Sequence, residues 1–283
     1  MKEKIEEILK DPSKLPAMSH VVIRVMELLR DPAVSINQLA TEISNDPTIT
    51  ASIIKLSNSA YYRASKPIRT VQEALMTLGI QTVKEMILVS ASKAVLHKDL
   101  KGYSLDAEEV WVHSLIVGLL SSKIVEHKKI DLPKDLAFTS GLLHDIGKVI
   151  LTQFFPYHIL DIRNELKNMT TTFTELEKKY FGYDHQEVGV QVLSAWNFPA
   201  ELIEVVGHHH NPQNAKKFPL LASVVHIANT IAIISGIGID IGGINHELSS
   251  FALQKTGIND SDLEMYYMQI PDLQKQIQDL RNS

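Results

Sequence analysis

Signals for helix starts and ends recur along this chain, and they constrain its fold more than any other feature. Asp46 precedes Pro47, which places an N-cap residue before a proline at the first helical position. Gly79 follows the apolar stretch ALMTL and suits a helix C-cap. Alternating strand patterns and tight hairpin turns are missing, so the sequence predicts an all-α protein. Three further segments have the spacing of a capping box: SINQ (35–38), TVQE (70–73) and TVKE (82–85).

The chain has 283 residues, which is enough for one large domain or two modest ones. Residues 1–105 contain a run of short predicted helices, and we expect them to form an N-terminal helical subdomain. Residues 106–283 contain longer predicted helices and most of the histidines, and we expect a second helical subdomain there. The polar segment HKDLKGYSLDAEE (97–109) is the expected junction between the two.

Composition excludes several classes of protein. The formal net charge is −5 and no long basic block occurs, so we expect no binding to duplex nucleic acid. The longest apolar region, 218–244, contains His226, Asn229, Asp240 and several glycines, which predicts a buried helix followed by a loop rather than membrane insertion. The chain has no cysteine, which rules out disulfides and thiolate metal sites and fits a reducing cytosol. We therefore expect a cytoplasmic protein.

Several of the twelve histidines lie beside other residue types that bind metals. Glu109 and His113 are four residues apart, so they share one face of a predicted helix. Imidazole and carboxylate donors without sulfur suit iron, manganese, zinc or nickel. Lys148 follows His144 by one turn, from where it could hold a phosphate oxygen. The other members of this set are His144 and Asp145 in GLLHDIGK (141–148), His185 in YDHQEVG, and His208, His209 and His210 in GHHHNP.

Each of these pieces also has a structural explanation. A Glu-x3-His pair is often a salt bridge or a solvated pair, and His113 alone is typical of a hydrogen-bonded core histidine. His185 could open a helix beside Asp184, and the three consecutive histidines could form a surface cluster. The order of the pieces within one predicted domain favours a shared metal site, but spacing alone leaves both interpretations open.

The HDIGK motif in a leucine-rich helix, with one histidine upstream and His and His-His downstream, resembles the HD superfamily of metal-dependent phosphohydrolases. The resemblance is greatest to its HDOD branch and covers roughly residues 15–235. It implies a compact all-α fold, usually found in bacterial signalling proteins, and most HDOD domains are regarded as regulatory. Three N-terminal segments carry the resemblance to that branch: LPAMSHVVIRVMELL (15–29), NDPTITASIIKLSNSAYY (45–62) and KPIRTVQEALMTLGI (66–80).

The related HD-GYP branch hydrolyses cyclic dinucleotides, and its motif order implies site roles for particular residues of this chain. His209 and His210 match the family's HHxP better than His208 does, because they precede Asn-Pro. Asn229 stands where the superfamily has a final metal-bridging Asp, and an amide supplies only a weak, uncharged ligand. The stretch NPQNAKKFP (211–219) lacks the Gly-Tyr-Pro loop of the hydrolases. The full set implied by the resemblance is Glu109, His113, His144, Asp145, Lys148, His185, His209 and His210.

Together these features predict an HDOD-type regulatory protein that retains a His/Asp metal site. The expected cofactor is a divalent transition metal, with iron or manganese preferred over zinc or nickel. The expected partners are signalling proteins, with a nucleotide or phosphate as a further ligand. The alternative is a metal-dependent phosphohydrolase acting on a nucleotide or phosphomonoester, in which Lys148 stabilises developing negative charge. A third interpretation is a scaffold that binds no ion.

Overall fold

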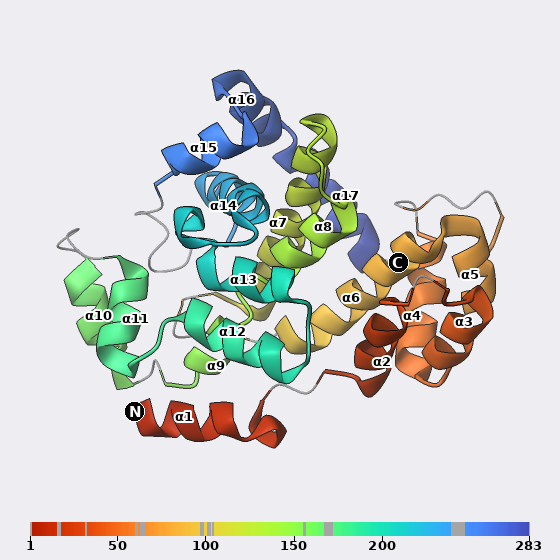
Figure 1. Ribbon diagram of the computed structural model, residues 1–283, viewed down its shortest axis with the longest axis horizontal. Coiled ribbons are helices and arrows are strands. Elements are labelled where there is room, and N and C mark those ends of the chain that lie inside the picture. The colour runs from red at the N-terminus through yellow and green to blue at the C-terminus, as the bar shows by residue number, and fades with distance from the viewer. Residues whose placement is uncertain are drawn as a thin grey trace. The chain divides into compact units, whose positions relative to one another are not determined.

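A computed structural model describes residues 2–15, 18–31, 33–59, 62, 66–96, 99–100, 103, 105–154, 157–166, 172–238 and 247–282 (Figure 1). Within these residues the chain is helical, and the one β feature is an isolated bridge between Leu100 and Leu105. The predicted all-α fold is therefore confirmed. The helices are α1 (Lys2–Lys10), η1 (Pro12–Lys14), α2 (His20–Leu28), α3 (Ile36–Ser44), α4 (Pro47–Ser57), α5 (Val71–Leu78), α6 (Ile80–Leu96), α7 (Ala107–His127), α8 (Lys134–Leu143), α9 (Lys148–Leu151), α10 (Ile159–Leu166), α11 (Phe173–Phe181), α12 (His185–Ala195), α13 (Ala200–His208), η4 (Pro212–Asn214), α14 (Pro219–Ile234), α15 (Ser250–Thr256), α16 (Asp260–Met268) and α17 (Ile270–Asn282).

The chain forms two compact units. The first unit comprises Met1–Pro16 and Leu96–Ile270 and contains α1 and α7 to α16. The second unit comprises Ala17–Val95 and Pro271–Ser283 and contains α2 to α5, nearly all of α6, and α17. The division into domains 1–105 and 106–283 stays a prediction, because compactness does not test which segments fold independently. The expected junction at 97–109 lies partly outside the described residues.

Local side-chain caps begin helices α3, α4 and α5 of the second unit. Ser35 caps α3, and a complete capping box with Gln38 is present, as the sequence predicts. The Asp46 carboxylate accepts hydrogen bonds from the backbone N–H groups of the second and third residues of α4. Thr70 caps α5 by accepting a hydrogen bond from the Glu73 N–H. These caps satisfy backbone donors that the first helical turn leaves without partners.

The predicted capping box at Thr82 is wrong. Gly79 ends α5 with a φ of 84°, a value that glycine tolerates and L side chains rarely adopt. The chain turns so sharply there that α6 already begins at Ile80. Thr82 therefore lies within the first turn of α6, where it cannot act as an N-cap.

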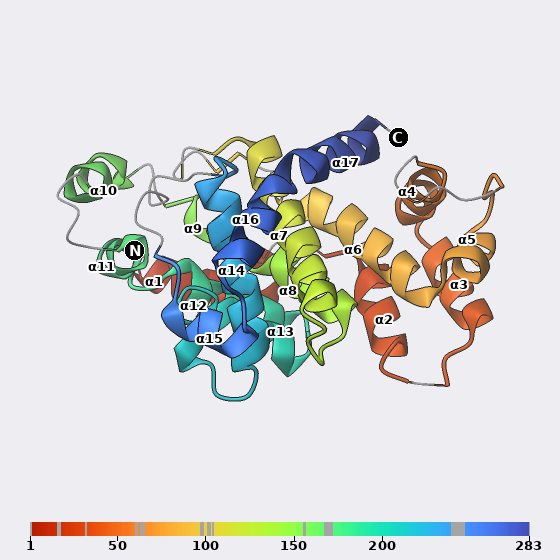
Figure 2. The same cartoon turned by 90° about the horizontal axis from the view of Figure 1, so that it is seen from above.

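In the first unit, α7 packs along α8 and α14, and Figures 1 and 2 show these three helices close together in both views. The crossing of α7 and α8 depends on two glycines. A Cβ at Gly141 would lie 2.7 Å from the Val117 carbonyl oxygen and 2.8 Å from the Gly118 Cα. The two backbones are thus too close to admit a side chain, and the glycines set how closely α7 and α8 can pack.

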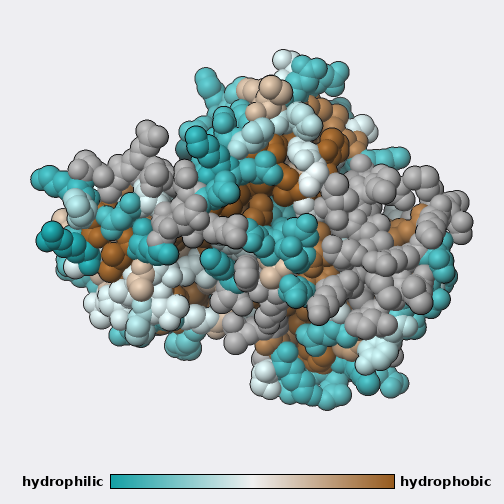
Figure 3. All heavy atoms as spheres, turned by 180° about the vertical axis from the view of Figure 1, so that it is seen from behind, coloured by the Kyte–Doolittle hydropathy of each residue, from teal (hydrophilic) through white to brown (hydrophobic). Residues whose placement is uncertain are grey.

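Helix α14 accounts for the longest apolar region of the sequence. It spans Pro219–Ile234, and nearly all of its residues after the first turn are buried. This confirms the predicted buried helix, while residues 239–246 of the expected loop lie outside the described residues. None of the described helices is long and apolar enough to cross a membrane. On the face drawn in Figure 3, hydrophobic areas alternate with hydrophilic side chains.

We predict that Gly141→Ala destabilises the protein by about 1–3 kcal/mol, because the added methyl group overpacks a contact between two backbones. Urea unfolding measures the free energy of unfolding. Gly207→Ala is the matched control: it also lies in a helix, but its Cβ would meet only the Val190 side chain, at 2.9 Å. The control should be within about 0.5 kcal/mol of wild type. Equal effects of the two substitutions would contradict the prediction.

Candidate metal centre

Four stretches of the first unit carry the histidines and the aspartate of the predicted site. His113 lies on α7, and His144 and Asp145 form the turn between α8 and α9. His185 is the first residue of α12, with Asp184 as its N-cap. His209 and His210 follow the end of α13. Ligand atoms of these residues lie within 4.8 Å of one another in two groups that share Asp145: His185, His209 and His210 in one, and His113 and His144 in the other.

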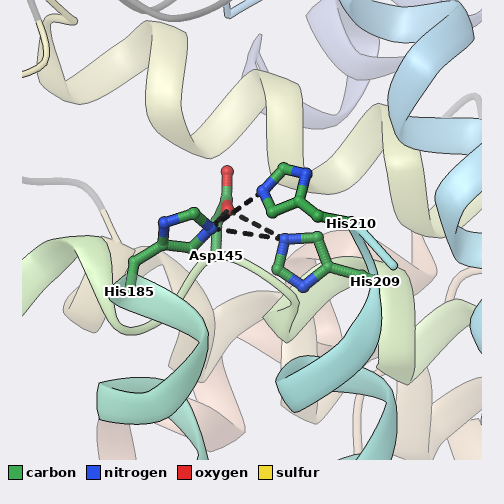
Figure 4. Close-up of side chains that lie close together, drawn as sticks. All are labelled: Asp145, His185, His209 and His210. Carbon is green, nitrogen blue, oxygen red and sulfur yellow. Dashed lines mark hydrogen bonds and ion pairs between the residues drawn. The ribbon is translucent and has the colours of Figure 1, made fainter. Parts of the chain in front are cut away.

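Asp145 stands between the two groups and faces each with a different oxygen. Its Oδ1 lies 3.5 Å from His185 Nε2 and 3.7 Å from His209 Nε2. Its Oδ2 lies 3.3 Å from His144 Nε2 and 3.7 Å from His113 Nε2. Figure 4 shows His185, His209 and His210 pointing toward one another beside Asp145. Each group of histidines therefore faces its own oxygen of the one shared carboxylate.

Hydrogen bonds donated by Nδ1 fix the orientation of four of the rings. The Nδ1 of His113 donates to the Ile237 carbonyl at 3.0 Å, and that of His144 donates to the Gly141 carbonyl at 2.7 Å. The remaining two bonds run from His209 Nδ1 to the Val206 carbonyl and from His185 Nδ1 to the Glu177 carboxylate. A carbonyl or carboxylate oxygen only accepts, so Nδ1 carries the proton. In the neutral rings, Nε2 therefore presents its lone pair toward Asp145.

The distances between ligand atoms fit coordination better than hydrogen bonding. His185 Nε2 lies 3.4 Å from His209 Nε2 and 3.0 Å from His210 Nε2. Two neutral nitrogens with facing lone pairs repel one another unless a cation lies between them. Ligands held at roughly 2.0–2.2 Å from a zinc ion are separated by about 2.8–3.6 Å at tetrahedral or octahedral angles. The cluster spacing falls in or close to that range.

Two buried atoms test the fit to a metal directly. His144 Nε2 and Asp145 Oδ1 are both buried, and neither has a hydrogen-bond partner. A buried polar atom without a partner is costly, so such atoms need an explanation. Both belong to ligand types that bind divalent transition metals, and no thiol competes, because the chain has no cysteine. The residues present therefore fit a divalent transition metal.

The electrostatics of the cluster favour neutral His113 and His209 beside an ionised Asp145. Burial lowers the pKa of His113 to about 4, and nearby His144 acts in the same direction. Burial likewise holds the pKa of His209 well below its ordinary value. Burial alone would raise the pKa of Asp145, but His144 and Lys148 outweigh it and hold that pKa well below the usual range. Neutral imidazole and ionised carboxylate are the forms that coordinate metals.

His185 differs from the other rings because it has a buried carboxylate as its partner. Glu177 is fully buried, and its Oε2 accepts hydrogen bonds from His185 Nδ1 at 2.7 Å and from the His185 backbone N–H at 3.0 Å. Burial lowers the pKa of His185, but the Glu177 charge and hydrogen bond outweigh it, so the pKa is raised. Such carboxylate–histidine pairs are common behind metal-binding histidines, where they orient the ring.

The structure places three of the sequence-predicted residues differently from the clustered ligands. Glu109 is exposed, and its carboxylate accepts a hydrogen bond from the Asp106 N–H in the capping box that begins α7, so it does not join the cluster. Lys148 is buried, with its Nζ 2.8 Å from Asp145 Oδ2. Asn229 is buried on α14, and its Oδ1 has no hydrogen-bond partner. Metal ligation by Asn229 stays a prediction.

Several residues that support the cluster were not singled out as site residues from the sequence. Glu177 orients His185, and the Gln186 side chain accepts a hydrogen bond from the His210 N–H at 3.2 Å. His226 Nδ1 donates to the His209 carbonyl at 2.9 Å. No motif in the sequence pointed to Glu177 as a partner of His185. Glu177 lies on α11, which ends at the left-handed Gly182, and not on the helix that carries His185.

Gly147 lets the HD turn approach α12. A Cβ there would lie 1.9 Å from the His185 carbonyl oxygen and 2.7 Å from the Gly189 nitrogen. Any side chain at this position would push α12, and with it His185, away from Asp145. The glycine of the HDIGK motif is therefore needed for the backbone contact that brings the two ligands together.

An all-α fold with an Asp centred among converging histidines defines the HD class of helical proteins. The HDOD domain model matches residues 15–212, and the chain belongs to that family. An uncharacterized protein of Treponema pallidum (strain Nichols) is 23% identical over 238 residues, which are 83% of this chain and 44% of the relative. The chain thus spans less than half the length of that relative.

Solved structures share the fold at low sequence identity. An HDOD domain protein of unknown function from Geobacter sulfurreducens has a TM-score of 0.70 at 23% identity, with 99% of this chain and 97% of that one covered. A protein from Marinobacter aquaeolei VT8, named as a candidate signal transduction protein, has a TM-score of 0.73 at 18% identity (95% and 59% covered). A candidate metal-dependent phosphohydrolase from Shewanella amazonensis SB2B has a TM-score of 0.54 at 21% identity (94% and 98% covered).

We predict that Glu177→Gln alters metal binding in two ways. Loss of the carboxylate that orients His185 should weaken metal affinity at neutral pH by about 10- to 100-fold. Glu177 raises the pKa of His185, whereas burial lowers the pKa values of His113 and His209. Of these three rings, His185 is therefore the first to protonate as pH falls, and a protonated ring cannot coordinate a metal. The substitution lowers this pKa, so the break in a plot of log Kd against pH should move to lower pH.

Metal titrations between pH 5 and 8 measure both effects. Glu175→Gln is the control, since Glu175 lies on the same helix and only caps its start. It should leave both the affinity and the position of the break unchanged. A break that stays in place in Glu177→Gln would show that His185 does not govern the pH dependence.

Proposed function

We propose that this chain is a regulatory HDOD protein in which Asp145 and the histidines around it bind a divalent transition metal. Iron or manganese is the preferred ion, and zinc or nickel is the alternative. The observation that carries the proposal is the convergence of the Nε2 atoms of His113, His144, His185 and His209 on one buried carboxylate. The regulatory part rests on the HDOD family, to which signalling roles are usually ascribed.

Burial of the cluster supports a regulatory role over rapid turnover. His144 and His209 are fully buried and Asp145 is 5% exposed. Five of the six clustered residues are buried, and only His210 is partly exposed. A substrate would therefore reach the centre from the side of His210. Asn229 supplies no negative charge where the superfamily has a bridging Asp. We propose signalling proteins as the partners of the helical N-terminal half, with a nucleotide or phosphate as a further ligand.

The ion site that includes His185, His209 and His210 is the stronger of the two in this proposal. It combines three imidazoles with Asp145 Oδ1, which has no hydrogen-bond partner. On the opposite side, Lys148 already pairs with Asp145 Oδ2 at 2.8 Å and competes with a cation for that oxygen. We therefore expect tight binding of one ion and weaker binding of a second.

Metal analysis tests the proposal. Untagged protein offered iron, manganese, zinc and nickel should retain at least one equivalent of metal. His209→Ala removes a ligand and should lose most of it, whereas His208→Ala, the adjacent histidine outside the cluster, should retain it. Circular dichroism checks that both variants keep their helices. Less than about one-tenth of an equivalent in the wild type would refute metal binding and favour a scaffold without an ion.

The second candidate function is a metal-dependent phosphohydrolase, and the position of Lys148 favours it. A bound ion would polarise a water molecule and a phosphoryl oxygen. Lys148 lies within reach of the same centre, and its ammonium group would hold the negative charge of a phosphate oxygen once Asp145 coordinates metal. Metal-dependent hydrolysis of a phosphomonoester that Lys148→Met abolishes, without loss of bound metal, would support this function.

We predict negligible hydrolysis of cyclic di-GMP by the manganese- or iron-loaded protein. The chain lacks the Gly-Tyr-Pro loop of the cyclic-dinucleotide hydrolases, and Asn229 cannot replace the charge of a bridging carboxylate. Chromatography of the reaction products measures linear dinucleotide and GMP. Metal-dependent turnover on the order of 1 per second or faster, the range of ordinary enzymes, would refute the prediction.

A further inference from the structure

Tyr103 lies between α6 and α7 in the sequence and is fully buried. Leu100 and Leu105, on either side of it, form an antiparallel bridge: the Leu100 N–H donates to the Leu105 carbonyl at 2.9 Å, and the Leu105 N–H donates to the Leu100 carbonyl at 3.3 Å. The Tyr103 N–H also donates to the Leu100 carbonyl at 2.8 Å. Both leucines are buried, so the backbone contacts of Tyr103 lie in the interior.

The hydroxyl of Tyr103 reaches the group that orients His185. It donates a hydrogen bond to Glu177 Oε1, while Glu177 Oε2 accepts the two hydrogen bonds from His185. All three side chains are nearly inaccessible to solvent, with at most 1% exposed. Tyr103 therefore helps to satisfy a buried charge whose other oxygen is committed to a clustered histidine.

The ring of Tyr103 contacts the other side of the same centre. Lys148 Nζ lies 5.4 Å from the ring centroid, a cation–π distance, and the same Nζ is 2.8 Å from Asp145 Oδ2. The Phe173 ring of α11 packs against Tyr103 at a centroid distance of 5.4 Å. One tyrosine thus contacts both the partner of His185 and the partner of Asp145.

We propose that Tyr103 is a positioning residue for the candidate metal centre and that it acts through Glu177 on His185. The inference rests on the proposed function, that the cluster binds a divalent metal.

Tyr103→Phe tests the proposal, because it removes the hydroxyl and keeps the ring that packs on Lys148 and Phe173. Zinc affinity is measured by competition with a chromophoric chelator, and the visible spectrum of the cobalt-loaded protein reports ligand geometry. We expect Kd for zinc to rise about 10-fold or more, as for other partners of metal-binding histidines, and the cobalt spectrum to change. Tyr180→Phe is the control: it removes a hydroxyl bonded to Glu165, outside the cluster, and should change neither.

A double-variant comparison separates positioning from general loss of structure. If Tyr103 acts through Glu177, adding Tyr103→Phe to Glu177→Gln should change Kd less than twofold, because the two effects are not additive. Glutamine is neutral, so the double variant leaves no unpaired buried charge and remains measurable even if the single Tyr103→Phe variant fails to fold. An undiminished loss of affinity in the Glu177→Gln background would overturn the inference.

The remaining outcomes distinguish this inference from the proposed function. If wild type binds zinc and Tyr103→Phe binds it within twofold as tightly, with an unchanged cobalt spectrum, the positioning role is overturned and metal binding stands. If wild type binds none of iron, manganese, zinc, nickel and cobalt, the proposed function fails and the inference fails with it.

Discussion

The arrangement of the first unit around the cluster follows from one constraint: the Asp145 carboxylate is buried and has to be compensated. A buried charge is tolerated only when it is paired and hydrogen-bonded. Lys148 compensates it from one side, and four imidazole rings surround it at 3.3–3.7 Å. Those rings come from α7, the HD turn, α12 and α13, so the position of one carboxylate relates four separate stretches of the unit to one another.

The hydrogen bonds that the Nδ1 atoms donate explain why the Nε2 atoms of the rings point toward Asp145. Each Nδ1–H of His113, His144 and His209 has a backbone carbonyl as its partner, which leaves no alternative donor position for the ring. His185 has the Glu177 carboxylate in place of a carbonyl. Glu177 raises the pKa of His185, whereas burial lowers the pKa values of His113 and His209. The cluster therefore combines rings whose pKa values are shifted in opposite directions.

Local chemistry made much of the fold predictable, and tertiary contacts limited the rest. The caps at Ser35 and Asp46 depend on neighbouring residues only, and the sequence contains all that they need. The prediction at Thr82 failed because Gly79 let two helices follow one another almost without a loop. The i, i+4 spacing of Glu109 and His113 correctly places them on one helix, yet Asp106 and the first turn of α7 engage the carboxylate instead.

For the site, the ligand types were recognisable in sequence because each lies in a short motif and the motifs follow one another in the order that the family resemblance implies. The supporting residues were not, since Glu177 and Tyr103 are 74 residues apart and meet only in the folded chain. Neither residue lies in one of the metal-ligand motifs, and Tyr103 belongs to the segment that the sequence analysis interpreted as a polar junction. Residues of this kind become visible only when hydrogen-bond partners in the interior are traced outward from the ligands.

The spread of the ligands along the chain has a consequence for cooperativity. From His113 to His210 the cluster spans almost a hundred residues, and it joins α7, the HD turn and the ends of α12 and α13 at one point. A bound ion would hold these stretches together in the folded state alone, so it would stabilise the fold by mass action, more strongly the further the metal concentration exceeds Kd. In a chain without cysteine, metal would thus join distant segments as disulfides do elsewhere, but the link would form only on folding and would be reversible with metal supply.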